Sequence, residues 1–168
     1  PGAYGVYTYA AGGVVNAEQE RSVALNYTEA PVATATVTSA SEEGLTVTAG
    51  ASKLGSTTGA YVALIEKGTE AEVTAGGGFA AMQFVRGVSG GAFSVDLVAA
   101  KAGLDRSKSY EVIVWQQHTL PTASTIYARS AVTISDAQWN GVFPPSSPTV
   151  SGSVKAASSD GLTVATSG

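Results

Sequence analysis

The 168-residue sequence predicts an all-β protein, a Greek-key β-sandwich of about seven strands that forms one module of a tandem repeat. Three observations support this fold class. The chain combines 20 glycines with only 13% charged residues, short alternating stretches are separated by glycine-rich turns, and one phrase occurs twice. Such a composition suits short strands joined by tight turns, whereas a disordered chain would be more charged and less apolar.

Seven stretches carry the pattern of β-strands. Tyr110, Val112 and Val114, for example, stand at every second position, as expected for a strand with one face in a core. Glycine-rich segments such as AGGG at 75–78 separate the stretches. One short helix-like segment, 98–105, precedes the sixth strand. The predicted strands span residues 32–39, 44–50, 60–66, 79–86, 92–98, 109–116 and 125–134.

The repeated phrase is GLTV, which occurs at residues 44–47 and again at 161–164. A shift of 117 residues that superimposes these segments also places Pro31 on Pro148. An identical tetrapeptide in phase with an upstream proline rarely arises by chance. We therefore expect an internal repeat.

A weaker match links the beginning of the chain to a later part. YGVYTYAAGG at 4–13 resembles YEVIVWQQH at 110–118, and a loop and a further β-rich stretch follow each segment. We expect residues 31–147 to form one complete domain, with residues 1–30 as the closing hairpin of a preceding copy and residues 148–168 as the opening strands of a following copy. The chain is thus expected to be a slice of a longer array.

A leucine and a tyrosine point to a particular kind of sandwich. Leu104 lies six residues before Tyr110, which opens an alternating strand. This pattern resembles the tyrosine corner of immunoglobulin-like and fibronectin type III domains, in which the tyrosine hydroxyl bonds to upstream backbone and the leucine fills the core. The resemblance covers residues 31–147 and implies an immunoglobulin-like fold; Arg106 stands where fibronectin modules often have proline. The alternative is that Tyr110 is simply an apolar residue at a strand start.

The segment YGVYTYAAGG carries a second, narrower resemblance. It is similar to the closing segment of domains in actinobacterial surface proteins, including the haem-transport-associated family. The match covers only about the first 25 residues. The haem ligands of that family lie elsewhere in its domain, so none is carried over. The resemblance implies a Gram-positive cell envelope.

Charge and composition narrow the range of partners and locations. The nine lysines and arginines are scattered and the net charge is −4, so we expect no nucleic-acid partner. No apolar run approaches the roughly 18 residues that a membrane span needs. The chain has no cysteine, which excludes disulfides and thiolate chemistry. Low charge with abundant serine, threonine and glycine favours an extracellular, cell-surface location.

The sequence offers no catalytic constellation. Its single histidine, His118, lies in the loop QQHTLPT, and no G-x-S-x-G elbow is present. The acidic residues Glu66, Glu70 and Glu72 flank a turn without the D-x-D-x-D spacing of a calcium loop. We therefore expect no enzyme activity, no catalytic residues, no metal ligands and no cofactor.

The first functional hypothesis is a structural module, a stalk or filament spacer. It rests on the repeat and on the proline-rich joint FPPSSPT at 143–149, which should hold neighbouring copies semi-rigidly. The terminal fragments cannot bury their apolar faces alone. We expect them to pair with neighbouring copies of the same protein by strand complementation, or to lie along the edge of the central domain.

The second hypothesis is a ligand-binding surface module, such as an adhesin, a glycan binder or a haem receptor. Aromatic and polar residues gather where the loops at one end of a sandwich cluster. The competing interpretation is a buried tryptophan among solvated neighbours. The candidate ligand-binding residues are Trp115, Gln117, His118 and Tyr127.

Overall fold

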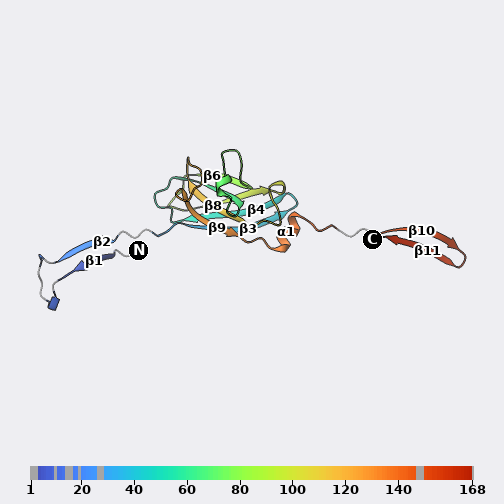
Figure 1. Cartoon of the computed structure of the whole chain (residues 1–168), viewed down its shortest axis with the longest axis horizontal. Helices are drawn as coiled ribbons and strands as arrows, with labels where there is room; N and C mark the ends of the chain where they lie inside the picture. The colour runs from blue at the N-terminus through green and yellow to red at the C-terminus, as the bar shows by residue number, and fades with distance from the viewer. Residues whose placement is uncertain are drawn as a thin grey trace.

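The computed structural model describes residues 4–9, 11–13, 17–18, 20–25, 29–146 and 150–167. Pro148, which the sequence repeat aligns with Pro31, lies outside the described residues, as do the other residues at the end of the proline-rich joint. The described part consists of antiparallel sheets and short helical segments, so the all-β prediction is confirmed. Figure 1 shows a central two-layered body with one hairpin beyond each end of it.

Seven strands build the central body: β3 (Val32–Ser41), β4 (Gly44–Ser52), β5 (Gly59–Glu66), β6 (Ala81–Arg86), β7 (Phe93–Ala100), β8 (Tyr110–Gln116) and β9 (Ile126–Val132). The first sheet has the order β3-β4-β7 and the second the order β6-β5-β8-β9. All pairings are antiparallel. Each predicted strand overlaps one of these strands, and the ends differ by at most two residues.

The core lies between the two sheets. Every second residue of β4 is buried, including Leu45 and Val47 at 1% and 0% exposed. They share one apolar cluster with Val62 and Leu64 of β5 and Val112 of β8. Burying a side chain of this size contributes about 1.5–3 kcal/mol. The alternation along β4 thus turns one face of the first sheet into the core, whereas β5 and β8 are buried along most of their length.

One α-helix, α1 (Asp136–Val142), is not among the elements predicted above. Its first turn is held by a capping box: the Gln138 N–H donates to the Ser135 hydroxyl at 3.3 Å, and the Ser135 N–H donates to Gln138 Oε1 at 2.8 Å. Because this cap starts a helix, β9 ends at Val132 instead of continuing to residue 134. Trp139 on α1 is buried against the core, so the helix closes the sandwich beside β3.

The expectation of a helix-like segment at 98–105 is wrong. Strand β7 continues to Ala100, and only a 3-10 turn, η3 (Lys101–Gly103), follows it. Ala99 pairs with Leu45 of β4 and is fully buried, so the alternation of the strand outweighs the helical propensity of the alanines. The other 3-10 turns of the described chain are η1 (Ala11–Gly13) and η2 (Glu70–Glu72).

Each terminal region forms a hairpin with a sheet of its own. The N-terminal hairpin pairs β1 (Tyr4–Thr8) with β2 (Arg21–Leu25), and the C-terminal hairpin pairs β10 (Ser151–Ser158) with β11 (Gly161–Ser167). Neither hairpin is hydrogen-bonded to an edge of a central sheet. The structure therefore differs from the expectation that the fragments lie along the edge of the central domain.

The C-terminal hairpin repeats the pairing of the β3–β4 hairpin at the shift of 117 residues. Val154 pairs with Val164 as Val37 pairs with Val47. In both hairpins the register then shifts by one residue, at the equivalent position of the first strand. The match between the two segments extends from residue identity to backbone pairing and to the position of a bulge.

The turn of each of these two hairpins needs glycine. Gly44 has φ 148°, and a Cβ there would collide with the backbone oxygen of Ala99. Gly161, at the equivalent turn of the C-terminal hairpin, has φ 149°. Only glycine adopts such a φ at low cost. The repeated GLTV phrase thus begins with the residue that the turn requires.

The N-terminal hairpin corresponds less closely to β8–β9. Tyr4 pairs with Leu25 as Tyr110 pairs with Val132. The pairing therefore aligns β1 with β8 at a shift of 106 residues and β2 with β9 at a shift of 107. The two hairpins thus pair their strands in the same way, but the segments that connect the two strands differ in length by one residue.

Candidate functional site

An aromatic row crosses the outer face of the second sheet, the face turned away from the first sheet. Tyr61 of β5 pairs with Phe84 of β6 on one side and with Trp115 of β8 on the other. Directly opposed residues of neighbouring strands point to the same face of a sheet. The ring centroids accordingly lie 4.8 Å apart for Tyr61 and Phe84 and 5.3 Å apart for Tyr61 and Trp115.

His118 extends this row beyond the end of β8. Its ring centroid lies 5.9 Å from that of Phe84, and the side chain is exposed. The guanidinium carbon of Arg86 lies 5.5 Å from the centroid of the same phenyl ring. We call Tyr61, Phe84, Trp115 and His118 the aromatic row.

The neighbours of His118 are held in place by hydrogen bonds. Trp115 is 2% exposed, and its indole N–H donates to the backbone oxygen of Thr119 at 3.0 Å. The Gln117 amide donates to the Thr58 hydroxyl at 3.3 Å. Trp115 therefore acts as a framework residue, and the accessible part of the row consists of half-buried Tyr61 and Phe84 with exposed His118.

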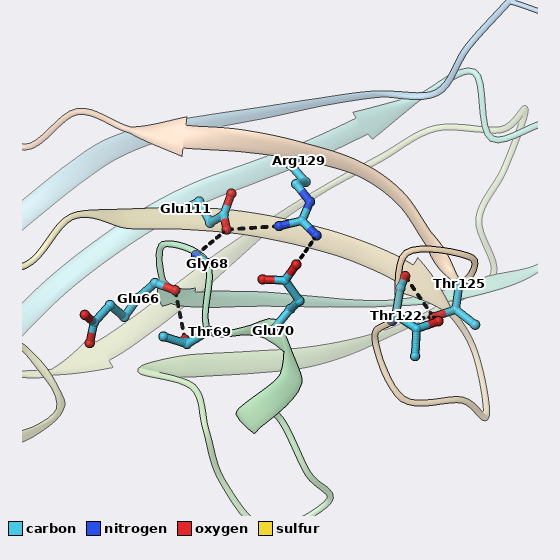
Figure 2. Close-up of polar contacts among 8 residues, drawn as sticks. All are labelled: Glu66, Gly68, Thr69, Glu70, Glu111, Thr122, Thr125 and Arg129. Atoms are coloured by element: carbon cyan, nitrogen blue, oxygen red, sulfur yellow. Dashed lines mark hydrogen bonds and ion pairs between the residues drawn. The ribbon is translucent and has the colours of Figure 1, made fainter.

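The loop that follows His118 is ordered by threonines. The Thr122 N–H donates to the Thr125 hydroxyl at 2.8 Å, and that hydroxyl donates to the Leu120 oxygen at 2.7 Å. Figure 2 shows these two threonines facing each other across the loop. His118 itself has φ 61°, an uncommon value for a residue with a Cβ. The imidazole is thus presented by a tightly bonded loop.

Tyr127 does not join the other candidate residues. Trp115 pairs with Ile126 and Val114 pairs with Ala128, so Tyr127 occupies a bulge in β9. Its ring packs against the inner core, whereas Ile126 packs with Trp115 on the outer face. The structure brings Trp115, Gln117 and His118 together and places Tyr127 on the other side of the sheet.

A shallow cavity adjoins Tyr61 and Trp115. Its volume is about 180 Å³, and loop residues 73–75 and 119–120 form its rim. Sites that enclose a drug-sized ligand measure about 300–1,000 Å³. This surface therefore suits a flat group stacked on the aromatic row better than a ligand enclosed in a pocket.

A cluster of charges lies on the same outer face. Glu111 is 5% exposed and is the one buried charged side chain among the described residues. Its Oε1 accepts from the Gly68 N–H at 2.9 Å and from Arg129 Nη1 at 3.2 Å, while Arg129 Nη2 donates to Glu70 Oε1 at 2.5 Å. Figure 2 shows the guanidinium between the two carboxylates. The cluster fastens the 67–72 turn to β8 and β9.

The contact between Arg129 and Glu70 shifts the pKa of both groups. The hydrogen bond from Arg129 holds the pKa of the Glu70 carboxyl below its ordinary value. The same bond raises the pKa of the Arg129 guanidinium. Because a buried carboxylate without its cation is costly, we assign the cluster a structural role.

The predicted corner residues lie at the entry to β8. Leu104 and Tyr110 are both buried, at 8% and 5% exposed. The Asp105 N–H donates to the hydroxyl oxygen of Tyr110 at 2.8 Å. Burial raises the pKa of the Tyr110 hydroxyl. The tyrosine thereby joins the loop after η3 to the core.

Two classes of feature are absent from the part of the chain that the structure describes. No three side chains of histidine, aspartate or glutamate there come together in a way that could hold a metal ion. Within the same residues, no helix is long and apolar enough to cross a membrane.

Comparisons of the chain with protein-family models, with curated proteins and with solved structures find no match. Function must therefore be inferred from features of the chain itself. The two that stand out are the repeated hairpin and the aromatic row.

The sequence pattern alone misses half of the aromatic row and the whole charge cluster. Tyr61 and Phe84 carry no local signal, because only the register of β5 and β6 sets them beside Trp115. Glu111 does carry a signal: it is the one acidic residue in the apolar strand YEVIVWQ, and a buried carboxylate needs a partner. Arg129 is the one charged residue of the predicted strand 125–134, so a search for a cation would find it.

Proposed function

We propose that this chain is a non-catalytic structural repeat module of an extracellular bacterial surface protein, in which it acts as a stalk or filament spacer. One observation carries the proposal: the C-terminal hairpin has the register, the bulge and the turn glycine of the β3–β4 hairpin at a constant shift of 117 residues. Such a hairpin is what the opening of a second sandwich requires. Modules repeated in tandem build elongated, quasi-one-dimensional proteins.

The strand order supports an immunoglobulin-like Greek-key module. Strands β3 and β4 pair, the chain then crosses to the other sheet through β5 and β6, and β7 returns to pair with β4. The hydrogen bond between Asp105 and Tyr110 lies at the start of β8, where immunoglobulin-like domains have their tyrosine corner. The order of the strands and the position of the corner point to the same class.

The proposed location rests on the composition and on the N-terminal segment. A chain without cysteine and with few charges is compatible with a bacterial cell surface. The resemblance of YGVYTYAAGG to actinobacterial surface proteins favours a Gram-positive envelope. Neighbouring copies of the same module are the partners that a spacer of this kind implies.

A graft tests whether the two hairpins are equivalent. Residues 150–164 replace residues 33–47 in the whole chain. The core positions of Val37, Leu45 and Val47 then receive identical residues, so we expect a cooperative thermal transition at a moderately lower temperature. Circular dichroism during heating measures it.

The control is the same graft shifted by one residue, taken from 151–165. Since a shift of one residue turns every apolar side chain to the opposite face, this chain should not fold cooperatively. If the thermal transition of the in-register graft is no more cooperative than that of the shifted graft, the hairpins are not equivalent and the repeat-module proposal is wrong.

A second candidate function is a ligand-binding surface module, an adhesin or a glycan binder. The aromatic row favours it, because the rings of Tyr61 and Phe84 beside exposed His118 offer a platform for the flat face of a sugar or another planar group. Nuclear magnetic resonance titrations with oligosaccharides and with haem test it. Shifts confined to the aromatic row would support binding, and their loss in His118→Ala would assign the contact. A spectrum that stays unchanged at millimolar ligand would exclude it.

A further inference from the structure

The end of the second sheet beside His118 carries an exposed cation. Arg86 is the last residue of β6, and its guanidinium carbon lies 5.5 Å from the centroid of the Phe84 ring. Among the described residues, no carboxylate forms an ion pair with Arg86. A guanidinium that stacks on an aromatic ring keeps its N–H edge free for an anion. Arg86 is therefore available to an anionic group beside the aromatic row.

The connections at this end of the second sheet contain no acidic residue. They are residues 53–58 before β5, 87–92 after β6 and 117–125 after β8. Lys53, in the first of them, is paired with Glu29 at 3.1 Å. The chain as a whole has a net charge of −4, so this end of the sheet differs in sign from the rest of the molecule.

The buried carboxylate of the outer face lies far from Arg86. Glu111 pairs with Ile65 of β5, whereas Arg86 pairs with Gly59 at the start of the same strand. Six residues of a strand span roughly 20 Å. The acidic cluster and the exposed cation thus occupy opposite ends of the outer face, and the field around Arg86 favours an anion.

Gly59 makes room for a second polar group beside Arg86. A Cβ at position 59 would lie 2.5 Å from Gln117 Oε1 and 3.3 Å from Cε2 of Phe84. The Gln117 amide therefore lies over the backbone of Gly59, where its donation to the Thr58 hydroxyl holds it. Because Gly59 pairs with Arg86, the amide and the guanidinium belong to one polar border at the end of the aromatic row.

This combination of groups matches one class of ligand. The half-buried rings of Tyr61 and Phe84 are apolar surfaces, and Arg86, Gln117 and His118 border them with groups that form hydrogen bonds. A pyranose ring has the complementary pattern, an apolar C–H face surrounded by hydroxyl groups. A carboxylate on that ring would in addition use the free cation, since guanidinium and carboxylate match in shape and charge.

We propose that the aromatic row binds acidic glycans: the ring of a uronic acid residue stacks on Tyr61, and its carboxylate binds Arg86. The inference rests on the second candidate function, because it names the ligand class of that surface. The ion pair is exposed, so it discriminates acidic from neutral sugars more than it adds affinity.

Nuclear magnetic resonance titrations of the whole chain test the carboxylate contact. The probes are the tetrasaccharides of galacturonate and of glucuronate, each compared with its carboxyl-reduced, neutral form at the same ionic strength. For at least one of the two sugars, the acidic form should have a Kd about fivefold lower than the neutral form, as expected for an exposed ion pair. The shifted resonances should be those of the aromatic row and Arg86.

Arg86→Gln should raise the Kd of the acidic form to that of the neutral form and leave the Kd of the neutral form unchanged. Lys67→Gln is the matched control, because it removes the same charge from an exposed residue at the opposite end of β5. It should leave both Kd values unchanged. Free acetate, at the same concentration of carboxylate, should not displace the acidic tetrasaccharide.

Three results would overturn the proposal: equal Kd values for the acidic and neutral forms, equal effects of Arg86→Gln and Lys67→Gln, or displacement by acetate. If the neutral forms still shift the aromatic row in these cases, the ligand-binding surface stands and its selectivity for acidic sugars alone is wrong. If no tetrasaccharide shifts the row at millimolar concentration, the second candidate function is wrong as well.

Discussion

At the scale of single residues, the buried side chains of Tyr110 and Glu111 carry polar groups whose partners lie on the turns around the core and on the neighbouring strand. The Tyr110 hydroxyl accepts from the Asp105 N–H, and the Glu111 carboxylate accepts from Gly68 and Arg129. A buried polar group that loses its partner costs more than the bond itself contributes. These contacts therefore select one arrangement of turns around the core.

Tyr110→Phe should lower the free energy of unfolding by about 1–3 kcal/mol, because the Asp105 N–H loses its acceptor in a partly buried turn. Urea denaturation followed by tryptophan fluorescence measures the change. Tyr127→Phe is the control: this tyrosine is half-buried in the same core, and its hydroxyl makes no hydrogen bond to the residues that the structure describes. If the two variants lose the same free energy of unfolding, the hydrogen bond between Asp105 and Tyr110 contributes no stability of its own.

Glu70 should link stability to acid pH. Because Arg129 holds the folded-state pKa of Glu70 below its ordinary value of 4.5, the folded chain binds fewer protons than the unfolded chain at acidic pH. The contribution of Glu70 is fully present above about pH 4.5 and is lost as the pH falls through the lowered pKa. The stability difference between the unaltered chain and Glu70→Gln should thus shrink on acidification.

Urea titrations at several pH values measure that difference. Glu42→Gln, which removes one carboxylate from the exposed turn between β3 and β4, is the control and should change the stability little. A difference for Glu70→Gln that stays constant from neutral to acidic pH would contradict the role of the ion pair.

At the scale of elements, α1 is a short helix that is stabilised both by its N-terminal cap and by packing against the core. A helix of seven residues is marginal by itself, so it depends on its cap and on the burial of Trp139. The helix also carries Asn140, whose amide oxygen accepts from Arg106 at 2.7 Å. The element therefore ties the end of β9 to the loop before β8.

Ser135→Ala should destabilise the protein by about 0.5–2 kcal/mol, because the Gln138 N–H loses its capping acceptor. Denaturant midpoints at constant slope measure the loss. Ser94→Ala, an exposed serine within β7, is the matched control and should change the midpoint little. Restoration of the midpoint by Ser135→Asp, which keeps a capping acceptor, would identify the cap as the cause.

At the scale of the whole molecule, stability resides in the central body. The two sheets bury one continuous core, whereas Leu25 and Leu162 of the terminal hairpins are more than half exposed. An isolated two-stranded hairpin is marginal in water. The hairpins should therefore open at lower temperatures than the sandwich.

Residues 31–147 should fold without either flank, because they contain all seven strands of the two central sheets. Differential scanning calorimetry should show one cooperative transition close to the main transition of the whole chain. A broad, non-cooperative transition in the excised segment would mean that the flanks contribute to the core and that the boundary is misplaced.

How far the sequence predicts this protein depends on the range of the interactions involved. Alternating residues such as Tyr110, Val112 and Val114 define strands, because the two faces of a strand are separated by neighbouring positions. The capping box at Ser135 and Gln138 is also local, so α1 could have been predicted from the pattern Ser-x-x-Gln. The candidate residues Trp115, Gln117 and His118 lie close together because they are close in sequence.

Strand register and bulges, by contrast, depend on the tertiary structure. Tyr61 meets Phe84 and Trp115 only because the sheet order places β5 between β6 and β8. A single bulge in β9 turns Tyr127 into the core and away from His118. The sequence by itself determined the strands and the turn glycines, because both depend on local sterics. Only the tertiary structure decided which side chains meet across strands, because a shift of one residue in register reverses the face of every side chain.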